Sequence, residues 1–380
     1  MPLYVKRCHM AAPVGTTHKE ALRWEQAGDG YMLLVTGDRL LLRLLSGMVS
    51  VGRGRPTVAM YRGNFAIDDA PEMMPLGHAR RSGDELLLSA REGDAPLLLL
   101  RIDGERLRLR TLAPGLDRIV IRFAGLAGDD LYGGGEQMSY LRLNGRRFPI
   151  WTSEPGVGRD KSDPFTQAMD AAGMAGGDYW TTNYPQPTLV TSGGIALHLD
   201  AACYSVIDAT GEGAAFEIWQ EEAAIEIHRA SSVADLVGLL STRFGRQPAL
   251  PGWATGGAIV GLKDGVNSFN RLDRMIDAGV AVTGLWCEDW AGIRQTSFGR
   301  RLFWDWQRNE ARYPDLPRRI EELHGRGIRF LAYANPYLCV DGPLFAEAEA
   351  GGHLALRQDV DAPYAVDFGE FDAGVVDFTR

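Results

Sequence analysis

The sequence predicts an antiparallel β-sandwich domain at residues 1–245, followed by an incomplete α/β barrel of the TIM type at residues 246–380. Two observations support this fold class. Between about residues 31 and 227, short apolar or alternating runs are separated by turn residues, a pattern typical of two packed antiparallel sheets. After Pro251, apolar runs alternate with helical periodicity, which indicates β-α units and a parallel sheet. The length of 380 residues is sufficient for two or three domains of about 100–200 residues each.

The expected sandwich begins with hairpins. Thr36-Gly37-Asp38 joins the first pair of strands, and Asp103-Gly104, a pair that favours positive φ, joins the second. The segments with a strand pattern include residues 31–35, 39–45, 97–102, 107–110, 118–123 and 224–228.

One segment, residues 131–161, interrupts the strand pattern and is expected to be a long loop at the rim of a ligand site. It contains Gly133-Gly134-Gly135, which permits unusual backbone angles or close approach of another surface. Glu136, Arg159 and Lys161 are its candidates for ligand contact. Two interpretations remain open, a solvated connection and a loop that walls the site.

The composition changes near residue 231. Ser231-Ser232 can cap a helix whose apolar residues have helical spacing over residues 233–244. Gly245 is expected to end this helix, and Pro248 and Pro251 indicate a linker.

The second domain is expected to contain parallel strands with helices between them. The strands are predicted at residues 258–262, 280–286 and 328–333, the first of them as a buried strand. The helices are predicted at residues 266–276, 315–325 and 343–350. Polar residues follow each strand, namely Lys263-Asp264, Glu288-Asp289, and Asn335 with Tyr337. This is the end of the strands at which α/β barrels carry their sites.

The number of strands is too small for a closed barrel. Such a barrel needs eight strands over about 250 residues. About 130 residues follow Pro251, and they carry the three strands and a candidate fourth at residues 374–378. We therefore interpret the chain as a fragment of a longer protein.

Composition excludes several classes of function. The formal net charge is −9 without a long basic cluster, so nucleic acid is not an expected partner. Four scattered cysteines (Cys8, Cys203, Cys287 and Cys339) argue against a disulfide framework and a structural zinc site, and no metal is expected. The first residues lack the apolar segment of a secretory signal, and no apolar run approaches the roughly 20 residues of a membrane span. A cytoplasmic enzyme is therefore expected.

The strongest candidate for a ligand site is the stretch of residues 284–306. Glu288 and Asp289 directly follow a predicted strand, and Arg300-Arg301 precedes three aromatic residues within residues 303–306. Carboxylates at a strand end, followed by arginine and tryptophan on a loop, suit a polar, anionic, ring-shaped ligand. A sugar that carries an anionic group is the leading candidate.

Three motifs carry a resemblance to a known family: GGGEQMSYLRLNGRRFPIWTSEPGVGRDK at residues 133–161, WCEDWAGIRQTSFGRRLFWDW at residues 286–306, and RFLAYANPYL at residues 329–338. These motifs are similar to motifs of the sulfoquinovosidases of glycoside hydrolase family 31. The resemblance extends from about Met60 to the last residue. The resemblance implies a β-sandwich, then an α/β barrel and small C-terminal β domains. It also implies retaining hydrolysis by two aspartates without a metal or other cofactor. The implied substrate is sulfoquinovosyl glycerol, a small sulfonated glycoside from which sulfoquinovose is released.

The resemblance further implies a five-residue sulfonate-recognition pattern, of which this chain supplies Lys263, Glu288, Arg301 and Trp304. A sulfonate stays anionic, so it favours a fixed cation such as arginine, with the Trp304 indole N–H and Lys263 as further donors. Glu288 repels a sulfonate and is expected to accept hydrogen bonds from sugar hydroxyls or to hold Lys263. Each residue alone also has an ordinary structural explanation, but their spacing together favours ligand binding. The fifth residue, a tyrosine, is expected beyond Arg380.

The two catalytic carboxyls of a retaining glycosidase stand about 5–5.5 Å apart, and both are expected beyond Arg380. Val366-Asp367-Phe368-Gly369-Glu370 is similar to the family's nucleophile motif, but it precedes the strand at residues 374–378 that the nucleophile motif follows. We therefore expect this motif not to supply the nucleophile. The 380-residue chain by itself is expected to be inactive.

Two alternative functions remain open. One is a family 31 α-glucosidase acting on neutral sugars, and the other is a non-catalytic carbohydrate-binding protein that ends near Arg380. Arg301 with Trp304 argues against the first alternative, because a neutral glucose needs no fixed cation at carbon 6. No membrane partner is expected, and a homo-oligomeric assembly remains open.

Overall fold

A computed structural model describes residues 22–28, 30–35, 37–45, 47–61, 64–156, 158–172, 177–297, 299–357 and 360–379. Cys8, Thr36, Arg380 and the N-terminal segment discussed above lie outside these residues. The chain divides into two compact units, Met1–Arg246 and Gln247–Arg380. Within the described ranges, no helix has both the length and the apolar character needed to cross a membrane.

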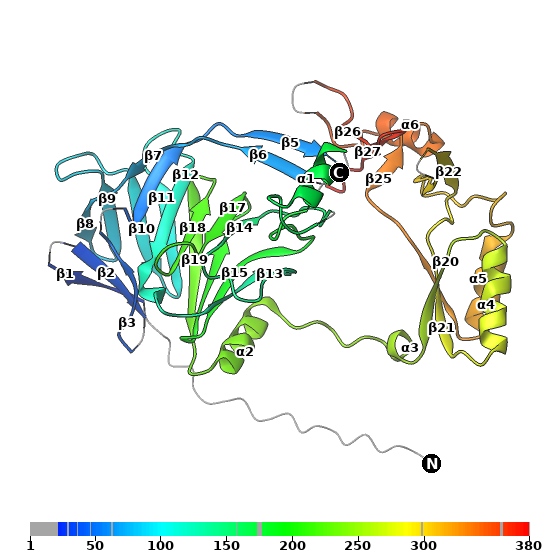
Figure 1. The fold of residues 1–380 in the computed structure, drawn as a ribbon, viewed down its shortest axis with the longest axis horizontal. Coiled ribbons are helices and arrows are strands. Elements are labelled where there is room, and N and C mark those ends of the chain that lie inside the picture. Colours follow the sequence, from blue (N-terminus) through cyan, green and yellow to red (C-terminus); the bar gives the residue numbers. More distant parts are fainter. Residues whose placement is uncertain are drawn as a thin grey trace, which may run out of the picture. The chain divides into compact units, whose positions relative to one another are not determined.

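The first unit contains two large antiparallel sheets (Figure 1). In spatial order, the eight-stranded sheet consists of β13 (Leu131–Gly135), β15 (Pro185–Thr191), β16 (Ile195–Asp200), β19 (Glu222–Arg229), β11 (Arg106–Thr111), β10 (Leu98–Asp103), β9 (Glu85–Ser89) and β8 (His78–Ser82). The six-stranded sheet consists of β14 (Arg147–Ile150), β17 (Ser205–Asp208), β18 (Ala214–Ile218), β12 (Arg118–Phe123), β4 (Val49–Arg53) and β7 (Glu72–Pro75). Smaller elements are β1 (Arg23–Ala27), β2 (Gly30–Val35) and β3 (Arg39–Arg43), the hairpin of β5 (Thr57–Tyr61) and β6 (Asn64–Asp68), and the 3₁₀ turn η1 (Ala124–Leu126).

The two large sheets pack against each other, because inward side chains from both belong to one hydrophobic core. Leu100 and Leu109 come from the eight-stranded sheet, Ile121 and Phe216 come from the six-stranded sheet, and all four are 0% exposed. Burial of each such side chain stabilises the fold by about 1.5–3 kcal/mol. A shift of one residue in register would turn these side chains outward, so the alternation specifies the strand pairing.

The predicted hairpins of the first unit are confirmed, with a correction to one turn. β2 pairs with β3, and β10 pairs with β11. Asp103 pairs with Arg106, so the turn is Gly104-Glu105 and not Asp103-Gly104. Gly104 has a φ of 63°, and glycine at the first central position is typical of a type II′ hairpin turn.

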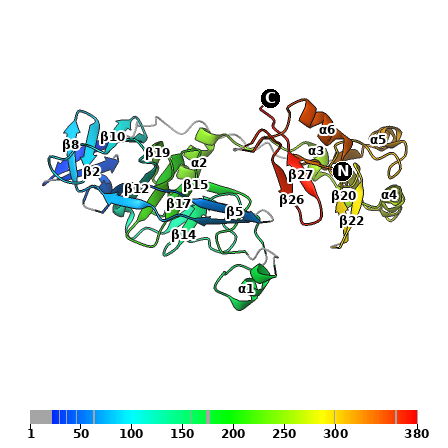
Figure 2. The same cartoon turned by 90° about the horizontal axis from the view of Figure 1, so that it is seen from above.

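The expectation of one long loop at residues 131–161 is wrong, because β13 and β14 lie within this segment and form edge strands of the two large sheets. Gly133, Gly134 and Gly135 have φ values of 111°, 74° and 84°, which are the unusual backbone angles expected for this glycine run. The register between β13 and β15 shifts between Gly133 and Gly135. Glycine has no side chain to alternate, so the strand pattern is absent from the sequence. Helix α1 (Pro164–Ala171) follows this segment and lies away from both sheets (Figure 2).

The helix predicted before the linker is confirmed as α2 (Val233–Phe244). The Ser232 hydroxyl accepts a 3.1 Å hydrogen bond from the Asp235 amide at the N-terminus of the helix. Gly245, with a φ of 85°, follows its last residue. Leu236 is buried against the sandwich, so this helix belongs to the first unit.

The second unit contains a parallel sheet of β20 (Ala258–Leu262), β21 (Val282–Cys287) and β24 (Arg329–Ala332). Helices α4 (Asn267–Asp277) and α5 (Leu316–Gly325) pack on the same face, where Leu272 and Leu323 contact sheet residues such as Leu262 and Leu285 (Figure 1). The remaining elements are α3 (Gly252–Thr255), the hairpin of β22 (Ile293–Thr296) and β23 (Gly299–Leu302), helix α6 (Pro343–Ala350), and the antiparallel sheet of β25 (Tyr337–Cys339), β27 (Asp372–Val375) and β26 (Ala365–Asp367).

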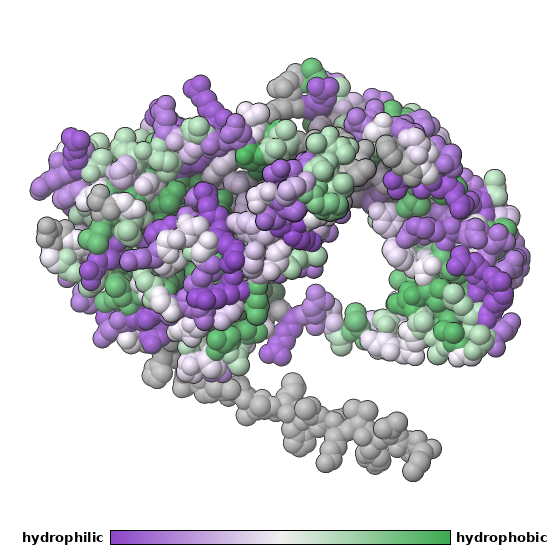
Figure 3. Space-filling view, in the orientation of Figure 1, coloured by the Kyte–Doolittle hydropathy of each residue, from purple (hydrophilic) through white to green (hydrophobic). Residues whose placement is uncertain are grey.

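Two expectations for this unit are wrong. The strand at residues 258–262 is mostly exposed, with Ile259 at 41%, because β20 is an edge strand and its alternate side chains face away from α4 and α5. Apolar surface is accordingly visible over β20 and β21 (Figure 3). Residues 374–378 do not form a fourth parallel strand, because β27 pairs antiparallel with β25 and β26. The described residues contain no closed barrel.

Candidate functional site

Lys263 and Glu288 lie side by side at the carboxyl edge of the parallel sheet. Leu262 and Cys287, the last residues of β20 and β21, are register partners, so the next residue of each strand emerges at the same edge. The Lys263 Nζ and Glu288 Oε2 atoms are 3.0 Å apart. The lysine side chain is 66% exposed and the glutamate side chain 25%. Glu288 was expected either to bind sugar hydroxyls or to hold Lys263, and the ion pair in the structure matches the second of these roles.

Asp289, the second carboxylate after β21, is engaged inside the protein. It is 0% exposed, and its oxygens accept hydrogen bonds from the Arg312 guanidinium and the Tyr313 hydroxyl. Burial and the hydrogen bond to Asp289 raise the pKa of Tyr313, and burial raises the pKa of neighbouring Cys287 to about 12. Asp289 is therefore a structural anchor under the strand end. Sequence reasoning missed both partners, because they lie 23 and 24 residues further along the chain.

Arg301 lies on β23 of the β22–β23 hairpin and is exposed. Its register partner, Arg294, makes an ion pair of 2.7 Å with Asp341, and its guanidinium lies 4.8 Å and 4.4 Å from the ring centroids of Phe303 and Phe371. The Arg294 hydrogen bond lowers the pKa of Asp341. Among the described residues, Arg301 has no ion pair or hydrogen bond. Its guanidinium is therefore available to an anionic ligand.

Trp304 follows the hairpin and combines a packed ring with an unused donor. Its ring centroid lies 5.5 Å from that of Tyr337, 4.9 Å from that of Phe368 and 5.6 Å from that of Phe371. Its Nε1 atom is buried and has no hydrogen-bond partner in the described parts of the chain. A buried N–H without a partner is uncommon and unfavourable, so an acceptor from a ligand would be stabilising there.

Backbone hydrogen bonds connect the strand end that carries Glu288 with the hairpin exit that carries Trp304. Gly292 donates a 3.0 Å backbone hydrogen bond to Asp289, and Phe303 donates one of 3.0 Å to Gly292. These bonds connect the strand end next to Glu288 with the residue before Trp304. The structure thus places Lys263 against Glu288, and it places Arg301 and Trp304 on one hairpin and its exit.

The three predicted rim residues lie in the first unit and have intramolecular partners. The Glu136 carboxylate accepts a 3.4 Å hydrogen bond from Thr182, and Arg159 donates one of 3.0 Å to the Thr181 carbonyl. Lys161 makes a 2.8 Å ion pair with Asp170 of α1. These contacts give each side chain a structural role, and ligand contact at the rim stays a prediction.

The two carboxylates of the motif at residues 366–370 are also engaged. Asp367 accepts a 2.6 Å hydrogen bond from the Gly369 amide, and the Glu370 carboxylate accepts hydrogen bonds of 2.8 Å and 2.9 Å from the Ser297 amide. Both residues flank or lie in the turn between β26 and β27. These bonds give both carboxylates a structural role, and the expectation that this motif does not supply the nucleophile stays a prediction.

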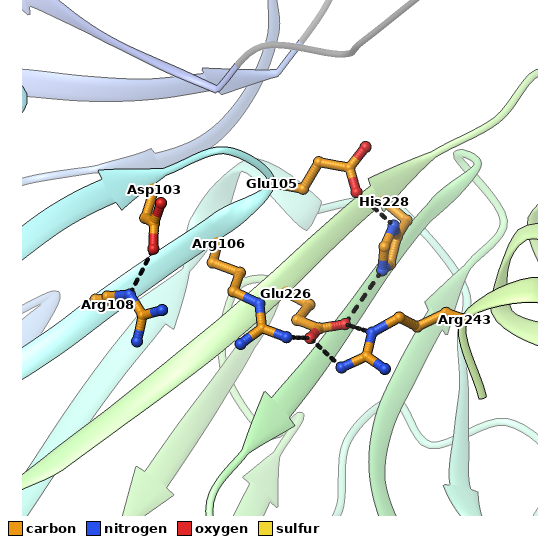
Figure 4. Close-up of a pocket in the computed structure, with 7 residues that line it drawn as sticks. All are labelled: Asp103, Glu105, Arg106, Arg108, Glu226, His228 and Arg243. Carbon is orange, nitrogen blue, oxygen red and sulfur yellow. Dashed lines mark hydrogen bonds and ion pairs between the residues drawn. The ribbon is translucent and has the colours of Figure 1, made fainter. Parts of the chain in front are cut away.

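A polar cavity of about 280 Å³ lies on the outer side of the eight-stranded sheet (Figure 4). Its centre is Glu226, only 2% exposed, which accepts hydrogen bonds of 2.9 Å and 2.8 Å from Arg243 of α2 and a further one from Arg106. His228 Nε2 is 3.6 Å from the same carboxylate. Because the guanidinium groups already bind Glu226, we interpret the cluster as the attachment of α2 to the sandwich. The β19 pattern gave no signal for it, since Glu226 occupies an outward position of the strand.

The chain resembles a glycoside hydrolase of known structure. No family model matches the chain. Its structure resembles that of a GH31 family sulfoquinovosidase from E. rectale in complex with the aza-sugar inhibitor IFGSQ, with a TM-score of 0.84 and 40% identity, covering 94% of this chain and 54% of that one. The chain is thus similar to a glycoside hydrolase of family 31.

Sequence comparison makes the resemblance more specific. The chain is 52% identical over 364 residues to the sulfoquinovosidase of Agrobacterium fabrum, covering 94% of this chain and 54% of that protein. It is 38% identical over 347 residues to the sulfoquinovosidase of Escherichia coli, covering 87% of this chain and 50% of that protein. The predicted resemblance to sulfoquinovosidases is therefore confirmed. The chain spans about half the length of the curated relatives it matches.

Proposed function

We propose that this chain is part of a retaining α-glycoside hydrolase, a sulfoquinovosidase that releases sulfoquinovose from sulfoquinovosyl glycerol. The similarity to the Agrobacterium fabrum sulfoquinovosidase over 94% of the chain supports this function. The structural observation that carries it is the combination of Arg301, without an ion pair in the described residues, and Trp304, whose indole N–H has no partner there. A fixed cation and a free N–H donor suit a sulfonate.

In this proposal each of the four residues has a separate role. Arg301 supplies the guanidinium that pairs with the sulfonate, and the Trp304 indole donates one hydrogen bond to a sulfonate oxygen. Lys263 adds a second positive charge at the strand ends. Glu288 orients Lys263 through their 3.0 Å ion pair and has a second carboxylate oxygen for a sugar hydroxyl.

We further propose that the three parallel strands are the first part of a (β/α)₈ barrel, with the sandwich domain at residues 1–245 and the barrel part at residues 246–380. The division between compact units after Arg246 and the parallel β20–β21–β24 order support this arrangement. The carboxyl edge of such a sheet is where barrels carry their sites, which agrees with the positions of Lys263 and Glu288.

The catalytic carboxyls are proposed to lie outside these 380 residues. Asp367 and Glu370 accept backbone hydrogen bonds at the turn between β26 and β27, which gives both carboxylates a structural role. Glu136, Arg159 and Lys161 are proposed to shape the rim of the complete site. The 380-residue chain alone is then expected not to hydrolyse 4-nitrophenyl α-sulfoquinovoside.

The test uses the complete protein that contains this chain and the variant Arg301→Glu. Charge reversal at the sulfonate should lower kcat/KM for 4-nitrophenyl α-sulfoquinovoside by at least about 100-fold. Arg300→Glu is the matched control, because it makes the same change at the adjacent residue, whose side chain points to the other side of the hairpin. Kinetics for this control should stay within about threefold of wild type.

The same two variants separate the alternative substrate class. A family 31 α-glucosidase would hydrolyse 4-nitrophenyl α-glucoside better than the sulfonated substrate, and Arg301→Glu would leave that preference unchanged. Equal losses for Arg301→Glu and Arg300→Glu would also contradict the proposed role of Arg301. A complete protein that binds glycosides without cleaving either substrate would instead indicate a non-catalytic carbohydrate-binding protein.

A further inference from the structure

The turn between β26 and β27 is tightly organised. The Asp367 side chain accepts a hydrogen bond from the Gly369 amide at 2.6 Å, and the Phe368 amide donates to the Phe371 carbonyl at 3.0 Å. Gly369 has a φ of 96°, which a residue with a side chain rarely adopts. The rings of Phe368 and Phe371 stack with centroids 5.3 Å apart, so both aromatic side chains lie on the same side of the turn.

Glu370, at the same turn, connects to the tip of the β22–β23 hairpin. Its two carboxylate oxygens accept hydrogen bonds of 2.8 Å and 2.9 Å from the Ser297 amide, and the Ser297 hydroxyl donates to the same carboxylate. The bond from the Ser297 hydroxyl and the bond from its amide lower the pKa of Glu370. The carboxylate is therefore ionised at neutral pH, and hydrogen bonds to an ionised acceptor are the stronger kind.

The two phenylalanines of the turn contact the other end of the same segment. Phe368 and Phe371 pack against the Trp304 ring, with centroids 4.9 Å and 5.6 Å from it. Phe371 also lies 4.4 Å from the guanidinium of Arg294, the register partner of Arg301. The turn between β26 and β27 thus contacts the β22–β23 hairpin at its tip through Ser297 and on β22 through Arg294. It also contacts Trp304, which follows the hairpin.

We propose that residues 367–371 form a brace that positions the sulfonate-binding side chains, with Glu370 as a positioning residue for Arg301. This inference rests on the proposed function. A two-stranded hairpin is only marginally stable by itself, so external contacts must restrict its motion. Arg301 has no partner of its own among the described residues, so the position of its guanidinium depends on the hairpin backbone. The motif at residues 366–370, which resembles the family's nucleophile motif, would then contribute to recognition of the sulfonate.

The brace acts on binding and not on bond cleavage. The sulfonate is bound in both the ground state and the transition state, so an interaction with it contributes equally to both. Loss of positioning should therefore raise KM and leave kcat nearly unchanged. A residue that only supported the stability of the fold would lower the active fraction, and with it the apparent kcat, on every substrate.

The test is Glu370→Ala in the complete protein. KM for 4-nitrophenyl α-sulfoquinovoside is expected to rise about fivefold to tenfold, with kcat within about twofold of wild type. Glu370→Gln keeps one acceptor oxygen for the Ser297 amide and should recover part of the loss. Glu322→Ala, which removes a carboxylate from the exposed face of α5, is the control and should leave both constants unchanged.

Two further measurements link the effect to the hairpin. Amide exchange over residues 293–302 should accelerate about tenfold in Glu370→Ala, while exchange in α5 stays constant. In a double-mutant cycle, Ser297→Ala should lower the effect of Glu370→Ala, since the two side chains share one interaction. Wild-type kinetics and exchange in Glu370→Ala, or fully additive effects with Ser297→Ala, would overturn the brace.

Failure of the brace is distinguishable from failure of the proposed function. If wild-type protein hydrolyses the sulfonated substrate and Arg301→Glu abolishes this activity, the proposed function stands whatever Glu370→Ala does. If wild-type protein does not hydrolyse the sulfonated substrate, the proposed function and the inference that rests on it both fall.

Discussion

Replacement of Glu226 by glutamine tests the interpretation of the polar cavity on the sandwich. The substitution keeps the shape of the side chain but removes the charge that Arg106 and Arg243 share. Breaking a fully buried ion pair by removing one partner destabilises a protein by about 3–5 kcal/mol. The side chains of these arginines remain 31% and 43% exposed, so water solvates much of their freed charge. We therefore expect a smaller destabilisation of about 2 kcal/mol around β19 and α2.

Hydrogen exchange measured by mass spectrometry on the complete protein provides the assay, because it reports local opening of each element. A loss of about 2 kcal/mol corresponds to about 30-fold faster amide exchange in peptides over residues 222–229 and 233–244. Glu222→Gln is the control, since Glu222 begins the same strand and is exposed. Unchanged exchange in both peptides of Glu226→Gln at pH 7 would refute the attachment of α2 by this cluster.

The same variant has a defined pH dependence. Burial by itself would raise the pKa of Glu226, but the Arg243 hydrogen bond and the Arg106 charge outweigh burial and hold the pKa below its usual value. The carboxylate therefore stabilises the folded state fully above its unfolded pKa of about 4.3, and this stabilisation is lost as the pH falls through the lower folded pKa. The difference in stability between wild type and Glu226→Gln should begin to shrink as the pH falls below about 4.3 and should vanish once the pH is below the folded pKa of Glu226.

Two further substitutions test local features of the two units. Gly135→Ala should destabilise the sandwich by about 2 kcal/mol or more, because the residue has positive φ and a Cβ would overlap the Tyr184 carbonyl oxygen; Gly128→Ala, also at positive φ but in open space, should lower the thermal midpoint less. Tyr313→Phe removes a hydroxyl donor from buried Asp289 and should lower the thermal midpoint of the second unit by about 2–5 °C, whereas Tyr364→Phe, at an exposed position, should not. Equal shifts within either pair would contradict the corresponding argument.

Sequence patterns predicted the elements that short-range signals control. The helix at residues 343–350 has the predicted limits, and β12 coincides with the predicted residues 118–123. The helix at residues 316–325 ends at Gly325 as expected, but Asp315 adopts a φ of 57° and does not cap it through its side chain. Proline, glycine and apolar spacing act within a few residues, so a single sequence contains them.

The sequence could not predict what depends on distant neighbours. A short apolar run has the same pattern in a parallel and an antiparallel sheet, so the pairing of β27 with β25 and β26 was not predictable. The exposure of Ile259 depends on which elements cover the sheet. Of the candidate site, the motifs supplied Arg301, Trp304 and the Lys263–Glu288 pair. The Ser297–Glu370 contact joins residues 73 positions apart and was not foreseen.

The glycine bulge of β13 has a consequence for self-association. β13 is the outermost strand of the eight-stranded sheet, and such strands present unpaired N–H and C=O groups that can template the addition of another chain. The left-handed backbone at Gly133, Gly134 and Gly135 interrupts the regular spacing of those groups. A strand from a second molecule would find no continuous ladder there. The three glycines, which permit these positive φ values, thus make this edge a poor template for the addition of a further strand.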